Sequence, residues 1–276
     1  MSESPSESAW NTEAPWGITD RVRRRLEATA REVASDWGLT LGPQFAMARY
    51  SFAAPAGEDA VLKIPPVEDD QADREADALA LWDGEGAVRL LRHDPARRAM
   101  LIERARPGTD ASAVLEDEAT AAAIAVGRRI WRPPAASQHF PTTRDWVRRW
   151  LPSDDTHELV PLARRTFASL TPVERIVAHG DFHHYNLLRH GERWVAIDPK
   201  PVLGEPEFDV PAFLWNPHGT TSTRARTERR IRAFADAGLD GDRIRAWAIV
   251  RGVCDGLPLA PGEGETPQLR VVRELL

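Results

Sequence analysis

Apolar residues recur at helical spacing in several segments of the chain. Between Thr19 and Trp37 they fall on one face of a helix, and Gly38 follows as a stop signal. A second segment of this kind, from 71 to 86, ends in two glycines. Further helices are predicted at 112 to 131, 143 to 151, 158 to 170 and about 223 to 259.

Short apolar runs bounded by turn residues predict strands. Such runs cover residues 45 to 54 and 60 to 64, separated by the turn sequence PAGED. Two more follow at 87 to 94 and 99 to 105, and RPGTD then closes the segment. Two later runs flank the turn sequence RHGER and predict a hairpin. Strands therefore gather in the first part of the chain, and helices dominate beyond about Gly108.

Composition limits the class of protein. Hydrophobic residues make up 42% of the 276 residues and charged residues 28%, which is typical of a soluble globular protein. The net charge of -6 does not favour a nucleic-acid partner, and no apolar run is long enough to cross a membrane. Cys254 is the single cysteine, so no internal disulfide can form and a cytoplasmic location is expected. Residues 1 to 18 are expected to be a flexible tail without a secretory signal.

Polar side chains that could take part in catalysis or metal binding are concentrated in the sequence VAHGDFHHYNLL, residues 177 to 188. The predicted hairpin that follows would bring Asp181, Asn186 and Asp198 to one end, because Asp198 ends its second apolar strand. Phosphoryl transfer requires such a set: one carboxylate orients the substrate hydroxyl, while a second carboxylate and an amide oxygen hold Mg²⁺ against the phosphates of ATP.

The sequences HGDFHHYN and AIDPKPVLGEPEFDV resemble the aminoglycoside phosphotransferase family, in the branch of streptomycin 6-kinases and hydroxyurea phosphotransferases. The resemblance covers roughly residues 38 to 260. It implies an α+β, bilobal fold like that of the protein kinases, with a sheet-containing N-lobe at 19 to 104 and a mostly helical C-lobe at 105 to 276. It also implies ATP-dependent transfer of a phosphoryl group to a hydroxyl of an aminoglycoside such as streptomycin, which would confer antibiotic resistance.

The resemblance assigns roles to individual residues. Asp181 would be the catalytic base, and Asn186 and Asp198 the metal ligands. Support for the catalytic loop would come from His179 and Asp209. Lys63, ending an apolar strand, would contact the nucleotide phosphates and pair with Glu75 on the next helix. The residues whose backbone would meet adenine are Glu103, Arg104 and Ala105.

One departure from the family pattern concerns the cover of the phosphates. Relatives carry a Gly-rich or Ser-rich turn between the first two strands, whereas this chain has FAMARYSFAAPAG, without glycine until Gly57. Either Arg49, Tyr50 or Ser51 supplies side-chain contacts, or nucleotide binding is weak. A pseudokinase that binds a nucleotide without turnover is therefore a second hypothesis.

The acceptor is expected to be a small, hydroxylated and cationic molecule. The candidate residues for binding it are His183, Asp154, Asp155, Glu158 and Asp255. Trp146, Trp150 and Trp215 are candidates for the border of the pocket, and His184 is expected to face solvent. Hydroxyurea or another hydroxylated metabolite is an alternative acceptor. A zinc hydrolase that uses the three histidines of HGDFHH is a third hypothesis.

Overall fold

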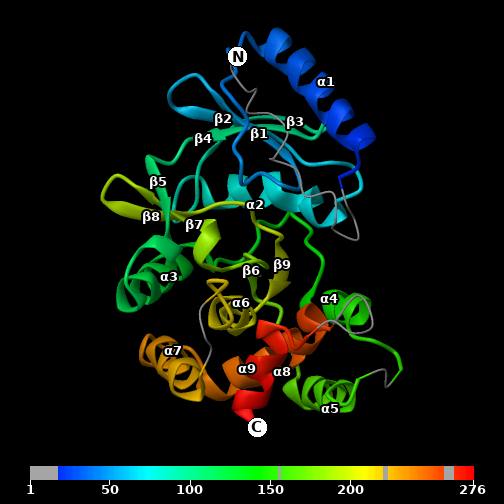
Figure 1. The fold of residues 1–276 in the computed structure, drawn as a ribbon, viewed down its shortest axis with the longest axis vertical. Helices are drawn as coiled ribbons and strands as arrows, with labels where there is room; N and C mark the ends of the chain where they lie inside the picture. The colour runs from blue at the N-terminus through cyan, green and yellow to red at the C-terminus, as the bar shows by residue number, and fades with distance from the viewer. Residues whose placement is uncertain (1–17, 155–156, 220–222, 258–263) are drawn as a thin grey trace.

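The computed structural model describes residues 18–154, 157–219, 223–257 and 264–276. Figure 1 shows a sheet and one long helix in the upper part and a group of helices in the lower part, with small sheets between them. The predicted α+β architecture, with strands first and helices later, is confirmed. In the described part of the chain no helix has the length and apolar character to span a membrane.

The upper sheet has four antiparallel strands in the order β1-β2-β4-β3. They are β1 (Phe52–Ala56), β2 (Ala60–Ile64), β3 (Leu90–Asp94) and β4 (Ala99–Glu103). The prediction that the first strand begins at residue 45 was wrong: β1 begins at Phe52, because residues 46 to 51 form turns. Residues 41 to 45 still run beside β1, with hydrogen bonds from Gly42 N to Pro55 O and from Phe45 N to Ala53 O. Pro43 has no N–H to donate, so this pairing stays too irregular to be a strand.

The alternation of β2 directs its side chains to two different helices. Leu62 and Ile64 pack against α1 (Asp20–Trp37), whose N-cap is Thr19. Val61 lies on the other side, toward α2 (Glu75–Trp82), and Lys63 shares that face. The helix predicted from 71 to 86 is a 3-10 turn, η1 (Asp70–Arg74), followed by the shorter α2. Ile18, which the sequence assigned to the tail, is buried against α1, while the rest of the tail lies outside the described residues.

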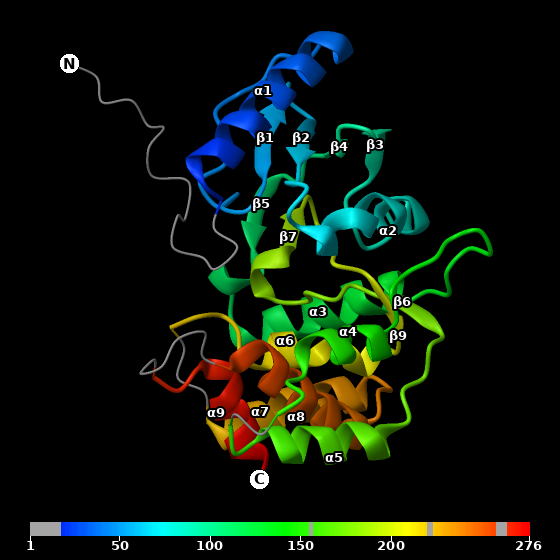
Figure 2. The same cartoon turned by 90° about the vertical axis from the view of Figure 1, so that its right-hand side faces the viewer.

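Two small sheets lie below the four-stranded sheet (Figure 2). The predicted hairpin across RHGER is confirmed as β7 (Leu187–His190) and β8 (Arg193–Ala196). The RPGTD segment, expected to close the first group of strands, contains β5 (Pro107–Asp110), which pairs with β7. The second sheet pairs β6 (Ile176–Ala178) with β9 (Val202–Gly204).

Helices complete the lower part. They are α3 (Glu116–Ile130), α4 (Thr143–Trp150), α5 (Val160–Leu170), α6 (Val210–Leu214), α7 (Arg224–Asp236), α8 (Gly241–Gly256) and α9 (Pro267–Leu275), with the 3-10 turns η2 (Ala111–Ala113), η3 (His184–Asn186) and η4 (Pro206–Phe208). The single helix predicted from about 223 to 259 was wrong: Gly238, at φ +106°, ends α7, and the Asp240 side chain caps α8. The structure adds α9, which packs against α8.

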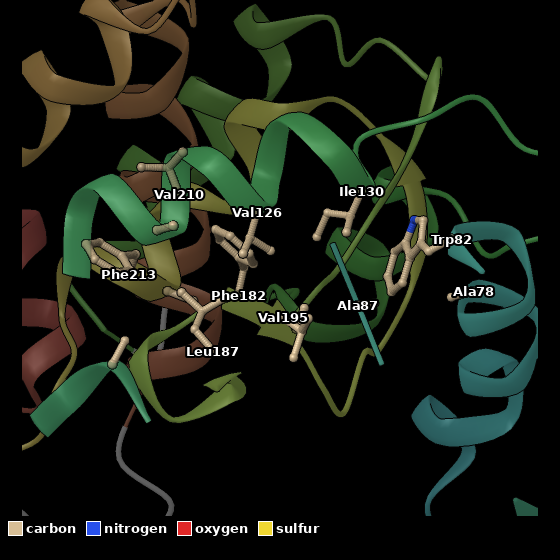
Figure 3. Packing of buried hydrophobic residues seen from close by; sticks show 14 of the residues in the cluster. Ala78, Trp82, Ala87, Val126, Ile130, Phe182, Leu187, Val195, Val210 and Phe213 are labelled. Atoms are coloured by element: carbon tan, nitrogen blue, oxygen red, sulfur yellow. The ribbon is translucent and has the colours of Figure 1, made fainter. Parts of the chain in front are cut away.

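One buried apolar cluster joins the upper and lower parts (Figure 3). It runs from Trp82 on α2, through Val126 and Ile130 on α3, to the hairpin residues Leu187 and Val195. The fully buried ring of Phe182 packs into this cluster. Because Phe182 directly follows Asp181, the core itself fixes the position of the carboxylate beside it.

Candidate active site

The segment after β6 is held by the buried carboxylate of Asp209. Its Oδ2 accepts a hydrogen bond from His179 N (2.8 Å) and its Oδ1 accepts one from Gly180 N (2.8 Å). The indole N–H of Trp131 donates to Oδ2 as well (2.8 Å). Three donors on one buried carboxylate leave the loop little freedom. This placement is what the supporting role predicted for Asp209 requires.

His179 ties the loop to the end of the hairpin. Its Nδ1 accepts a hydrogen bond from Asp181 N (3.3 Å), so Nε2 donates to the carbonyl oxygen of Ile197 (2.9 Å). Burial lowers the pKa of His179, which keeps the ring neutral. The ring also stacks on Trp82, with centroids 6.1 Å apart. His179 thus links Asp181, α2 and the strand that leads to Asp198.

Gly180 occupies a position that no other residue can take. Its φ is +82°, and a Cβ atom there would lie 1.8 Å from the carbonyl oxygen of Lys200. The backbone of Lys200 is close because its N–H donates to His179 O (2.8 Å). The glycine of HGD is therefore required by the packing of two backbone segments.

Gly180→Ala should lower the free energy of unfolding by about 3 kcal/mol or more, because strain at positive φ adds to a backbone clash. Urea denaturation measures the loss. Gly191→Ala is the matched control: Gly191 also has a positive φ (+58°), but open space surrounds its Cβ position, so only about 1 kcal/mol of strain is expected. Equal losses in the two variants would refute the clash at Gly180.

The predicted convergence of polar side chains at the hairpin end is present in the structure. The amide nitrogen of Asn186 donates to Asp181 O (2.9 Å) and to Asp181 Oδ2 (3.3 Å). Ile197 N donates to Asn186 O (3.0 Å), which places Asp198, the next residue, beside this pair. Asp198 has a φ of +56°, a strained conformation for a residue other than glycine. Such strain is characteristic of functional positions.

Lys63 approaches the same group from the upper sheet. Its Nζ lies 2.6 and 2.7 Å from the two carboxylate oxygens of Glu75 and 2.5 Å from Asp198 Oδ1. Burial alone would lower the pKa of Lys63, but the carboxylates of Asp198 and Glu75 outweigh it and raise that pKa. The ammonium group therefore stays charged, and it joins β2 and α2 to the strand end that carries Asp198.

His183 contacts the predicted base directly. Its Nε2 lies 3.3 Å from Asp181 Oδ1. Burial would raise the pKa of Asp181, but the positive charges of His183 and Lys200 outweigh it and hold that pKa far below its usual value. Burial would likewise lower the pKa of His183, but Asp181 raises it above its ordinary value. Asp181 is thus ionised at neutral pH.

The chemistry of the donor set suits Mg²⁺. The Asn186 amide nitrogen is engaged by Asp181, which leaves the amide oxygen free of hydrogen bonds within the described residues. Asp198 accepts the hydrogen bond from Lys63 through Oδ1, so its Oδ2 remains available to a metal ion. One amide oxygen and one carboxylate oxygen are hard ligands of the kind that Mg²⁺ takes beside waters and phosphates.

The three histidines of HGDFHH have separate partners. His179 binds Ile197 O, His183 contacts Asp181, and His184 lies by Arg230. In the ranges that the structure describes, no three His, Cys, Asp or Glu side chains come together in a way that could hold a metal ion. The zinc hypothesis therefore has no geometric support in this loop.

Of residues 103 to 105, which were predicted to contact adenine, two donate their backbone N–H groups to other parts of the protein. Glu103 N donates to Arg89 O (2.8 Å), and Arg104 N donates to Asp59 O (2.8 Å). The side chain of Glu103 reaches His190 on β7 (3.1 Å). Of the three predicted residues, only Ala105 keeps its N–H outside the hydrogen bonds of the described chain.

A cavity of about 480 Å³ opens beside Asp181. Its lining includes residues that the sequence had put forward: His183, Trp146, Trp150, Trp215 and Asp255. It also includes residues that sequence reasoning missed: Gln71, Lys200, His218, Arg251 and Gln268. Arg251 ties the cavity to the loop, since it donates to Gly180 O (3.0 Å) and pairs with Asp255 (3.1 Å). The one feature of the sequence that pointed to Arg251 is its place on a predicted helix.

The other acidic candidates for acceptor binding do not line this cavity. Glu158 pairs with Arg273 on α9 and is exposed. Asp154 is exposed as well, and its carbonyl accepts a hydrogen bond from Arg164 (2.7 Å). Asp155 lies outside the described residues. The structure therefore leaves Asp154 and Glu158 out of the cavity beside Asp181, and Glu158 contacts α9 instead.

The expectation that His184 faces solvent was wrong. The residue is 1% exposed, and its ring stacks on Phe213 with centroids 4.0 Å apart. The neighbouring Arg230 is also buried and is neutralised by Glu116 (2.5 Å). Arg230 further donates to the carbonyl oxygens of Phe213, Leu214 and Asn216. Burial alone would raise the pKa of Glu116, but hydrogen bonds from Arg230 and Arg226 lower it to about 2.

This network predicts a pH-dependent contribution to stability. The pKa of Glu116 is lower in the folded chain, so its contribution is complete above an unfolded pKa of about 4.5 and is lost as the pH falls toward 2. Glu116→Gln should lower the melting temperature at neutral pH, and the difference from wild type should shrink below about pH 4. Thermal melts of both proteins across this range are the measurement. A difference that is constant with pH would contradict the ionised pair.

Comparison with known proteins agrees with this geometry. Residues 48–259 match the family described as aminoglycoside/hydroxyurea antibiotic resistance kinase. The chain is 30% identical to the hydroxyurea phosphotransferase of Kitasatospora aureofaciens, over 94% of this chain and 79% of that protein. It is 29% identical to the streptomycin 6-kinase of Streptomyces glaucescens, over 82% of this chain and 80% of that protein.

A solved structure shares the fold. An aminoglycoside phosphotransferase of Streptomyces rimosus, in complex with ADP and streptomycin, superposes with a TM-score of 0.53 at 17% identity, over 82% of this chain and 97% of that one. At this identity the likeness concerns the fold alone. The match of the family over most of the chain and the 30% identity to the hydroxyurea phosphotransferase over 94% of this chain establish that it belongs to the aminoglycoside/hydroxyurea antibiotic resistance kinases.

Proposed function

We propose that this kinase transfers the γ-phosphoryl group of ATP to a hydroxyl group of a cationic aminoglycoside, with streptomycin as the first candidate. The observation that carries the proposal is the position of Asp181. Its ionised carboxylate lies on the wall of the cavity, while Asn186 and Asp198 lie next to it on the side of Lys63. A base therefore stands between a site for an acceptor and a site for phosphates.

Asp181 would orient the acceptor hydroxyl and accept its proton. The hydroxyl oxygen forms the new bond to the γ-phosphorus, and the bond from that phosphorus to the bridging oxygen breaks, with its electron pair leaving on ADP. The contact from His183 to Asp181 Oδ1 is long (3.3 Å) and on one oxygen only, so an acceptor hydroxyl can replace it. The low pKa of Asp181 keeps the carboxylate ready as an acceptor.

Asn186 and Asp198 would hold Mg²⁺, which when bound neutralises negative charge on the phosphates. Lys63 would contact phosphate oxygens, kept in place by Glu75. The adenine would lie near residues 103 to 105, with Ala105 N–H as the free donor. The turn at 46 to 51 would cover the phosphates through side chains such as Arg49, since it lacks glycine.

The size of the cavity favours an aminoglycoside over hydroxyurea as acceptor. A volume of about 480 Å³ is in the range of sites for drug-sized ligands. Hydroxyurea is small and uncharged, so it would leave most of this space to water. The cavity also presents the carboxylate of Asp181, that of Asp255, which is paired with Arg251, and three tryptophans, whose rings suit a guanidinium or ammonium group.

An acceptor panel tests the proposal. Purified protein with ATP and Mg²⁺ is incubated with streptomycin, other aminoglycosides or hydroxyurea, and ADP release is followed. Streptomycin or a related cation should stimulate ADP release most. Stimulation by hydroxyurea alone would contradict the assignment of the acceptor, and nucleotide binding without turnover for any acceptor would favour the pseudokinase hypothesis.

Asp255→Asn should raise KM for streptomycin about tenfold with little change in kcat, because it would remove a carboxylate from the proposed acceptor site and leave the reacting atoms untouched. Steady-state kinetics give both constants. Glu158→Gln is the matched control: this acid was also a candidate, but it lies outside the cavity lining, so KM should stay unchanged. An increase in KM only for Glu158→Gln would reverse the assignment.

A further inference from the structure

The chain is almost free of lysine. Of its 36 basic residues, all are arginine except Lys63 and Lys200. The exposed positions that proteins often fill with lysine carry arginine throughout. Because arginine fills every other basic position, the two lysines are candidates for positions where the shorter, non-planar cation matters for function.

Both lysines lie beside Asp198. Lys63 approaches from β2 and contacts Asp198 Oδ1 directly (2.5 Å). Lys200 follows Asp198 by two residues and lines the cavity together with Asp181 and His183. Its backbone is fixed on both sides, by the hydrogen bond to His179 O and by the close approach to Gly180. Lys63 thus approaches Asp198 from the upper sheet, whereas Lys200 lies on the wall of the cavity.

The two ammonium groups differ in their ion-pair partners. That of Lys63 is bound by two carboxylates. That of Lys200 has no ion pair or side-chain hydrogen bond to any residue that the structure describes. The ammonium group of a lysine is charged at neutral pH. A charged and unpaired ammonium group on a cavity wall is available to an anionic ligand.

We propose that Lys200 is a second phosphate-binding lysine, which contacts the γ-phosphoryl group of ATP from the acceptor side during transfer. This inference rests on the proposed function. As the acceptor oxygen bonds to phosphorus and ADP leaves, Asp181 takes the hydroxyl proton, and Lys200 keeps all its protons and donates hydrogen bonds to the phosphoryl oxygens. Lys200 thereby supplies positive charge that the glycine-free turn at 46 to 51 does not provide through its backbone.

The choice of lysine fits this position. An ammonium group is compact and presents three donors that rotate with the side chain, whereas a guanidinium group is planar and larger. Near the carboxylates of Asp181 and Asp198, a planar group would pair with them in a fixed geometry. Lysine can instead donate to a group that moves from ADP to the acceptor.

The test compares nucleotides with and without a γ-phosphate. Binding of ADP and of the β,γ-imido analogue of ATP is measured by calorimetry with Mg²⁺ for wild type, Lys200→Met and Lys63→Met. Lys200→Met should weaken binding of the analogue about tenfold and leave ADP binding within about twofold. Lys63→Met should weaken both nucleotides. A loss of both or of neither in Lys200→Met would overturn the proposal.

Kinetics supply the second readout. Lys200→Met should lower kcat about 100-fold with melting temperature and KM for the acceptor near wild type, and Lys200→Arg should recover part of the loss. Arg232→Met, on the exposed face of α7, is the control for loss of one positive charge and should keep full activity. A kcat within about threefold of wild type in Lys200→Met would refute the role of Lys200. Absence of turnover in wild type would instead refute the proposed function.

Discussion

Asp181→Asn should lower kcat for phosphorylation of the acceptor by about 10³-fold or more while the protein stays folded. The amide cannot accept the hydroxyl proton, and general-base catalysis contributes about 10² to 10⁴ in rate. The substitution preserves shape, so the hydrogen bond from the Asn186 amide to the backbone oxygen of Asp181 can persist. Steady-state kinetics with ATP and streptomycin, together with a thermal melt, are the measurements.

Asp145→Asn is a suitable control for this variant. Asp145 is an exposed acid of the capping box of α4 and lies outside the cavity lining, so the change should affect stability slightly and kcat very little. If Asp181→Asn kept more than about a tenth of wild-type kcat, another group would have to accept the proton.

Asp209→Asn should lower the free energy of unfolding by about 3 kcal/mol or more and reduce activity at the same time. Three donors point at the two oxygens of this buried carboxylate, from His179 N, Gly180 N and Trp131 Nε1. An amide replaces one oxygen with a donor, so at least one N–H would face another N–H without a partner. Hydrogen bonds to a charged group contribute about 1.5 to 3 kcal/mol each. Urea denaturation gives the loss in stability.

Two comparisons identify the cause of this loss. Glu192→Gln, in the exposed turn of the β7–β8 hairpin, removes one negative charge and should leave stability within about 0.5 kcal/mol of wild type. Trp131→Phe removes a single donor to Asp209 and should cause a smaller loss than Asp209→Asn. Stability unchanged in Asp209→Asn would show that the carboxylate does not hold the catalytic loop.

The parts of the site that sequence reasoning located are those fixed by local periodicity. The hairpin across RHGER follows from two apolar runs and a short turn, and it brings Asn186 and Asp198 together. The alternation along β2 places Lys63 on the face of the following helix, where Glu75 occupies its first turn. The hairpin needed only neighbouring segments and their spacing, whereas the pairing of Lys63 with Glu75 was implied by the family resemblance.

The parts that sequence reasoning missed depend on packing between distant segments. His184 is polar and lies in a loop, but α6 and α7 bring Phe213 and Arg230 to bury it. Arg251 looked like an ordinary polar residue of a helix, whereas Asp154 was expected to bind the acceptor. In the structure Arg251 reaches Gly180, 71 residues away in the chain, whereas Asp154 does not line the cavity. No local pattern distinguishes these two cases.

Detection of the phosphorylated product tests the central claim most directly. Purified protein, ATP, Mg²⁺ and streptomycin are incubated, and the mixture is analysed by mass spectrometry with wild type and Asp181→Asn in parallel. The wild type should convert streptomycin to a product heavier by one phosphoryl group, with one ADP released per product, and the variant should form about 10³-fold less. Equal product from both proteins, or nucleotide binding without a phosphorylated product from any acceptor, would contradict the assignment of this site to phosphoryl transfer.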